Sequence, residues 1–119
     1  MKHLLIVDDE EAVCWALQRA LTREGHRVAV AASAEEAFGL VAKQRPDAIV
    51  LDVRLPGLDG GEVYRRLRAS DPDGRTPVLF LSAATSLDLY RQGIDDGVLL
   101  RKPYDVQDLV ELVRALLTR

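Results

Sequence analysis

Short, continuous hydrophobic stretches recur along the chain and alternate with segments of helical spacing. The apolar stretches are typical of strands buried on both faces, because such strands have few polar side chains to point at water. The segments between them place apolar residues three or four positions apart, as amphipathic helices do. The predicted strands are Leu4–Val7, Val28–Ala31, Ala48–Leu51, Val78–Leu81 and Val98–Arg101.

Residues that begin or end helices lie where this pattern requires them. Gly25 follows the first predicted helix at a position where glycine commonly ends one. Ser33 and Glu36 form a capping-box pattern, and Asp105 is a good N-cap for the last helix. The predicted helices are Glu11–Glu24, a second from Ser33 to about Gln44, Glu62–Ala69, the short Ser86–Gln92, and a final helix that carries Val106 to Leu117.

Five strands that alternate with helices predict right-handed crossovers and a parallel sheet with helices on both faces. The fold class is therefore α/β, and with the flavodoxin-like strand order 2-1-3-4-5 the first and third strands lie side by side. Ligands of such sheets bind outside the carboxyl ends of the strands. The 119 residues fit one domain, so we expect a single domain over residues 1–119.

Composition and charge narrow the setting of this domain. Sixteen basic and 19 acidic side chains give a formal charge of -3 without a block of like charge, so direct nucleic-acid binding is not expected. The single cysteine, Cys14, cannot form an internal disulfide and suits a reducing compartment. Without an apolar stretch long enough to span a bilayer, the expected location is the cytoplasm.

Charged residues end three of the predicted strands abruptly. Asp8 and Asp9 follow the first strand, Asp52 follows the third and Lys102 follows the fifth. Carboxylates that meet at one sheet edge raise one another's pKa unless a cation is present. Hard oxygen ligands with room for water suit Mg²⁺, with Mn²⁺ as an alternative. Because one carboxylate can then attack phosphorus, the pattern indicates a metal-assisted phosphoryl site.

Two further side chains are candidates for this site. Lys102 is suited to stabilise charge on phosphoryl oxygens. It is preferred to the adjacent Arg101 because Pro103 follows it and bends the chain toward the site. The Ser82 hydroxyl, at the end of the fourth strand, is placed to bind the phosphoryl group, but a serine there also commonly caps a helix, and both interpretations stay open.

Four short motifs at the strand ends, taken in order, resemble the receiver domains of bacterial response regulators. They are VDDE (Val7–Glu10), DVRLPGLDG (Asp52–Gly60), LSA (Leu81–Ala83) and KPY (Lys102–Tyr104). The resemblance covers essentially the whole chain and implies a CheY-like fold and a role in a two-component system. The stretch AVCWALQRALTREGH is also similar to receivers of enhancer-binding regulators of the nitrogen-regulation type.

The resemblance assigns roles around the predicted phosphoryl site. It implies that Asp52 is the phosphoacceptor, and that Asp8, Asp9, Asp52 and the main-chain carbonyl of Arg54 hold Mg²⁺.

The resemblance also implies that Ser82 and Lys102 contact the phosphoryl group. It further implies a cis peptide bond before Pro103 and makes Tyr104 a rotamer switch coupled to Ser82.

Partners follow from the same resemblance. A sensor histidine kinase or phosphotransfer protein would donate the phosphoryl group. An output domain or protein, expected to regulate transcription, would respond to a change in the face formed by Ser86–Gln92, Val98–Arg101 and the final helix. A homodimer that forms on phosphorylation is kept open. The chain would assist only its own phosphorylation and dephosphorylation, so it is not expected to be an enzyme otherwise.

Two other functions remain as alternatives. One is a protein-binding module that keeps the fold and signals without phosphate. The other is an aspartyl-phosphate phosphatase of the haloacid-dehalogenase type, although Arg54 stands where such enzymes need a second aspartate. Trp15 is predicted to lie opposite Val13 and Leu17 on the first helix, where it either lies flat on the surface or anchors a partner.

Overall fold

The computed structural model describes residues 2–55, 58–71, 76–83, 90–91 and 98–118. Within them, five parallel strands form one sheet in the order β2-β1-β3-β6-β7, which is the predicted order 2-1-3-4-5. The predicted fold class is therefore confirmed, and each strand end lies within one residue of its prediction. The strands are β1 (His3–Val7), β2 (Arg27–Ala31), β3 (Ala48–Asp52), β6 (Val78–Ser82) and β7 (Val98–Arg101).

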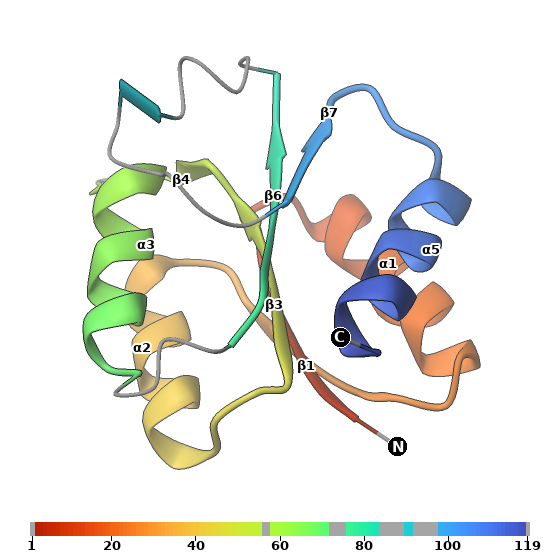
Figure 1. The fold of residues 1–119 in the computed structure, drawn as a ribbon, viewed down its shortest axis with the longest axis horizontal. Helices are drawn as coiled ribbons and strands as arrows, with labels where there is room; N and C mark the ends of the chain where they lie inside the picture. The colour runs from red at the N-terminus through yellow and green to blue at the C-terminus, as the bar shows by residue number, and fades with distance from the viewer. Residues whose placement is uncertain (1, 56–57, 72–75, 84–89, 92–97, 119) are drawn as a thin grey trace.

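Helices cover both faces of this sheet (Figure 1). In the described part of the chain, one face carries α2 (Ala34–Lys43) and α3 (Gly60–Ala69), and the other carries α1 (Glu11–Arg23) and α5 (Val106–Leu117). None of the helices within the described ranges is long and apolar enough to cross a membrane. The helix predicted at Ser86–Gln92 lies outside the described residues, except for Tyr90 and Arg91, whose backbone is helical.

The predicted helix ends are present in the structure. The Ser33 hydroxyl accepts a hydrogen bond from the Glu36 N–H at 3.2 Å. The Glu36 carboxylate accepts one at 2.9 Å from the N–H of Ala32, one residue before the N-cap. Asp105 caps α5 through its carboxylate. Gly25, with a φ of 91°, lies just after the α1 C-cap in the left-handed region that favours glycine.

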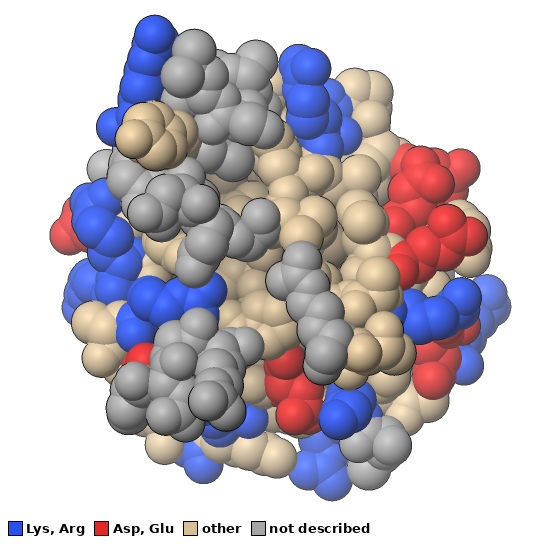
Figure 2. Space-filling view, in the orientation of Figure 1, with Lys and Arg blue, Asp and Glu red and all other residues tan. Residues whose placement is uncertain are grey.

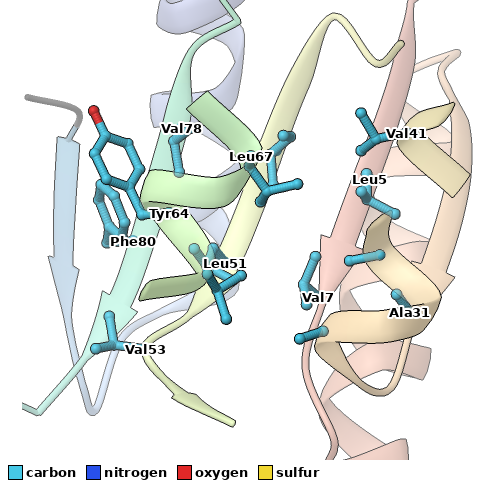
Figure 3. Packing of buried hydrophobic residues seen from close by; sticks show 14 residues of the cluster. Leu5, Val7, Ala31, Val41, Leu51, Val53, Tyr64, Leu67, Val78 and Phe80 are labelled. Atoms are coloured by element: carbon cyan, nitrogen blue, oxygen red, sulfur yellow. The ribbon is translucent and has the colours of Figure 1, made fainter. Parts of the chain in front are cut away.

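Two hydrophobic clusters, one on each face, hold the helices to the sheet. Every residue of the central strands β3 and β6 is buried, whereas the edge strands β2 and β7 are partly exposed. This double burial is the reason for the continuous apolar stretches in the sequence. Figure 3 shows the cluster beneath α2 and α3, whose labelled members are Leu5, Val7, Ala31, Val41, Leu51, Val53, Tyr64, Leu67, Val78 and Phe80.

A small antiparallel pair of strands, β4 (Arg54–Leu55) and β5 (Leu58–Asp59), connects β3 to α3. The sequence did not predict this pair. It begins two residues after Asp52 and leads into α3, which begins at Gly60 rather than at the predicted Glu62. The segment therefore fixes the backbone just beyond the predicted phosphoacceptor.

Candidate functional site

The strand register brings the charged strand ends together. Val7 of β1 pairs with Leu51 of β3, so Asp8 and Asp52 leave adjacent strands at the same level. Ser82 ends β6, the next strand, and pairs with Arg101 of β7, which directly precedes Lys102. The carboxyl edge of the sheet thus gathers two carboxylates, a hydroxyl and an ammonium group, as the sequence predicted.

Asp52 is buried and held from two sides. Its side chain is 3% exposed, and its Oδ1 atom lies 3.2 Å from the Lys102 Nζ atom. The same oxygen accepts the Arg54 N–H at 3.0 Å. These contacts fix the orientation of the carboxylate and balance part of its charge in a site that water barely reaches.

Asp8 lacks such a balance. The residue is 1% exposed, and its Oδ1 atom accepts the Glu10 N–H at 2.9 Å. Its Oδ2 atom is buried and finds no hydrogen-bond partner among the described residues. Burial raises the pKa of Asp8 above its ordinary value, and the negative charges of Asp52 and Glu10 add to this effect, against the Glu10 N–H and Lys102, which lower it.

The carboxylate group that could hold a cation differs in one member from the predicted set. Oxygens of Asp8, Glu10 and Asp52 lie within 4.8 Å of one another. A divalent cation there would satisfy the orphaned Oδ2 of Asp8 and offset the repulsion, so these residues fit Mg²⁺. Asp9, also predicted as a ligand, is exposed and lies outside this group. Its role and that of the Arg54 carbonyl stay predictions.

The sequence missed Glu10, although its signal is visible afterwards. The backbone of Glu10 is extended, with φ -90° and ψ 112°. Along extended chain, side chains at i and i+2 point the same way. Glu10 therefore faces the same side as Asp8, and Asp9 faces the other.

The lysine–proline turn is tied to the fourth strand of the sheet. The Lys102 N–H donates to the Ser82 carbonyl at 2.8 Å, which holds these two predicted phosphoryl-contacting residues together. The Lys102–Pro103 peptide bond is cis, as the resemblance implied. Ser82 itself is 3% exposed.

Tyr104 lies half-buried beside the acidic group. Burial, followed by the charges of Asp8 and Asp52, raises its pKa to about 12, so its hydroxyl stays protonated at neutral pH. The ring packs against the hydrophobic cluster beneath α1 and α5. Its role as a rotamer switch stays a prediction.

Cys14 of α1 is buried close to the same acids. Its Sγ atom donates to the Asp8 carbonyl at 3.2 Å, which ties α1 to the end of β1. Burial first, then the charges of Asp8, Asp9 and Asp52, raise the pKa of the thiol to about 11.

The Trp15 side chain is exposed, as predicted from its helical position. It is 63% exposed, and the Arg19 guanidinium lies 5.3 Å from its ring centroid. A cation–π contact of this kind holds the ring along the helix surface. Whether Trp15 also anchors a partner stays a prediction.

The chain matches the family model of the response regulator receiver domain over residues 4–114. The chain belongs to this family. The receiver domain is 45% identical to the transcriptional regulatory protein AfsQ1 of Streptomyces coelicolor, with 100% of the chain and 52% of that relative covered. It is 43% identical to the response regulator MprA of Mycobacterium leprae, with 98% of the chain and 51% of that relative covered. The chain thus spans about half the length of these curated relatives.

A solved structure agrees with the fold of this receiver domain. The chemotaxis protein CheY4 of Vibrio cholerae superposes with a TM-score of 0.88 at 28% identity, and 98% of each chain is covered. The predicted family and its place in bacterial two-component signalling are confirmed. Receiver domains are signalling switches rather than ordinary enzymes. The narrower resemblance to the nitrogen-regulation type stays a prediction.

Replacing Asp8 by asparagine is expected to stabilise the metal-free protein. A raised pKa means that the folded state holds this proton more tightly than the unfolded chain, so the wild type loses stability as pH rises through that pKa. Asp8→Asn removes the buried charge and keeps an oxygen for the Glu10 N–H. We expect a gain of about 1 kcal/mol at pH 7, or several degrees in melting temperature. The gain should vanish below the ordinary pKa of 3.8.

Urea unfolding at pH 7 and at a pH below 3.8, in buffer freed of divalent ions, measures this effect. The control is Asp9→Asn, which removes the neighbouring exposed carboxylate and should leave stability unchanged. Added Mg²⁺ should stabilise the wild type more than Asp8→Asn, because ligand binding to the folded state raises its stability. If Asp8→Asn and Asp9→Asn stabilised the metal-free protein equally, the burial argument would be contradicted.

Proposed function

We propose that residues 1–119 act as one phosphoacceptor switch, with Asp52 as the residue that is phosphorylated. The observation that carries this proposal is the position of the Asp52 carboxylate, buried between the Lys102 ammonium group and the acidic group of Asp8 and Glu10. An ion pair between Asp52 and Lys102 that served only the structure would need no further acids beside it. A nucleophile that attacks a phosphoryl group does need cations on both sides to offset the charge.

The phosphoryl group would come from a histidine of a sensor kinase or a phosphotransfer protein. An Asp52 carboxylate oxygen attacks phosphorus, a P–O bond forms, and the P–N bond to the donor imidazole breaks as that imidazole departs. Lys102, now 3.2 Å from the attacking carboxylate, contacts a phosphoryl oxygen in the product, and Ser82 donates its hydroxyl to another. Mg²⁺ would be held by Asp8, Asp52 and Glu10, with Asp9 and the Arg54 carbonyl as further ligands, and it would supply neutralising charge.

Phosphorylation would then change the surface that partners meet. The added group carries about two negative charges at neutral pH, and it draws Lys102 and Ser82 toward it while Tyr104 turns inward. The affected face includes β7 and α5. AfsQ1 is named a transcriptional regulatory protein, so the proposed output is transcription regulation by a domain or protein that this chain contacts in the bacterial cytoplasm.

The test is phosphorylation by acetyl phosphate, followed by intact-protein mass. We expect the mass of one phosphoryl group to be added with Mg²⁺ and almost none after chelation by EDTA, because the unbalanced acids then repel the donor. Mn²⁺ is expected to replace Mg²⁺. If no group is added under any condition, the phosphate-independent binding module becomes the better explanation. Repeated turnover of small phosphate esters would instead indicate the phosphatase.

A further inference from the structure

A groove lies between α2 and α3, and the phosphoryl chemistry does not use it. Its volume is about 540 Å³. Buried Val41 and Leu67 form its apolar floor, and the half-buried ring of Phe38 lies beside them. The remaining lining residues are exposed, and they are Ala42, Arg45, Arg66 and Ser70.

Arg66 presents a charge at this groove that no described carboxylate neutralises. Its guanidinium carbon lies 4.2 Å from the centroid of the Phe38 ring. Among the residues with described side chains, none forms an ion pair with it. The Phe38 ring therefore holds a rigid, exposed cation over an apolar floor, with its hydrogen-bond donors available to a ligand.

Arg45 adds a second cation to the rim. Its guanidinium contacts the Ser70 carbonyl and lies 3.8 Å from Asp71. Asp71 is 8% exposed, and it also lies 3.6 Å from Arg68 and accepts the Thr76 N–H at 2.9 Å. One buried carboxylate is thus shared between two arginines, so it neutralises Arg45 only in part. The groove has a net positive rim although the whole chain carries -3.

Basic side chains also gather over a wider part of the surface than the groove itself. Figure 2 shows Lys and Arg gathered on the side of the molecule that α3 occupies in Figure 1. α3 contributes three arginines within four residues, Arg65, Arg66 and Arg68. A ligand with negative charge is attracted to this side, and the apolar floor strengthens the binding of a ligand that also carries a hydrophobic group.

We propose that this groove binds an acidic peptide segment of a partner protein, with one apolar side chain placed against Phe38, Val41 and Leu67. Carboxylates on either side of that anchor pair with Arg66 and Arg45. Arginine forks match carboxylates in two-point contacts, which favours this ligand. A nucleic acid would match the charge but would leave the apolar floor without a partner.

The probe is the peptide acetyl-Asp-Glu-Leu-Glu-Asp-amide, titrated into the isotope-labelled protein and followed by amide NMR shifts. We expect saturable binding with a Kd below about 1 mM. The shifts should be confined to α2, to α3 and to the residues that directly follow each of these helices. The amide analogue, with Asn and Gln in place of the acids, should bind at least about tenfold more weakly. A duplex DNA of the same charge serves as the rival probe.

Three variants locate the binding. Arg66→Glu should weaken peptide binding at least about tenfold. Ala42→Lys adds a cation to the exposed rim and should tighten binding. Arg23→Glu reverses an exposed arginine at the end of α1, on the other face of the sheet, and should have no effect. Absence of saturable binding, an equal loss in Arg23→Glu, or tighter binding of DNA that Arg66→Glu abolishes would each overturn the proposal.

Discussion

Asp52→Asn is expected to lose phosphorylation by acetyl phosphate almost completely, by at least about a hundredfold in rate. The amide is nearly the same size and still accepts the Arg54 N–H, which now binds Oδ1 of the carboxylate at 3.0 Å. An amide oxygen is, however, a poor nucleophile. It also lacks the charge that holds the Lys102 ammonium group at 3.2 Å. The expected loss is therefore one of chemistry, with the fold retained.

The matched control is Asp47→Asn, at the opposite end of the same strand. Asp47 precedes β3 and is exposed, and its carboxylate accepts the His3 N–H at 2.7 Å, far from the acidic group. This variant should be phosphorylated at the wild-type rate. Intact mass gives the extent, and peptide sequencing by mass spectrometry gives the position. If another residue of the Asp52→Asn variant were phosphorylated at the wild-type rate, the nucleophile would be misassigned.

Phe80→Ala is expected to lower the free energy of unfolding by about 3–5 kcal/mol. Phe80 is 1% exposed in β6, and its ring forms an edge-type contact with Tyr64 of α3, with ring centroids 5.2 Å apart at an interplanar angle of 63°. Truncation leaves a cavity between the central sheet and α3 (Figure 3). Since small domains are stable by only about 5–15 kcal/mol, much of the total stability is lost.

Urea unfolding compares Phe80→Ala with Trp15→Ala, a truncation of a larger aromatic side chain that is 63% exposed. The exposed truncation should cost less than about 1 kcal/mol. A similar small cost for Phe80→Ala would mean that the cluster beneath α3 closes around the missing ring. The difference between the two variants therefore measures burial rather than aromatic content.

The strands were predictable because both faces of this sheet are covered. Errors arose only at polar ends, each one residue beyond the apolar stretch: His3 and Arg27 begin β1 and β2, and Asp52 and Ser82 end β3 and β6. Backbone pairing continues through such residues, and apolarity alone cannot reveal it. The pair β4–β5 has two residues in each strand, too few for a period to appear.

The start of α3 and one member of the acidic group were missed for local reasons. Gly60 and Gly61 have poor helix propensity, so the predicted helix began at Glu62. No ligand role was predicted for Glu10, because only its extended backbone, which the sequence does not reveal, aligns it with Asp8. Asp8, Asp52, Ser82 and Lys102 were placed correctly at one edge because parallel topology leaves strand ends no other position.

The burial of the Cys14 thiol close to the acids has a practical consequence for labelling. With a pKa of about 11, the thiol is ionised in only about one molecule in ten thousand at neutral pH, and thiolate is the form that reacts with maleimides. The side chain is also 8% exposed. A cysteine introduced on the surface should therefore take a fluorophore or spin label selectively. Cys14 can remain in place, and its contact between α1 and β1 need not be disturbed.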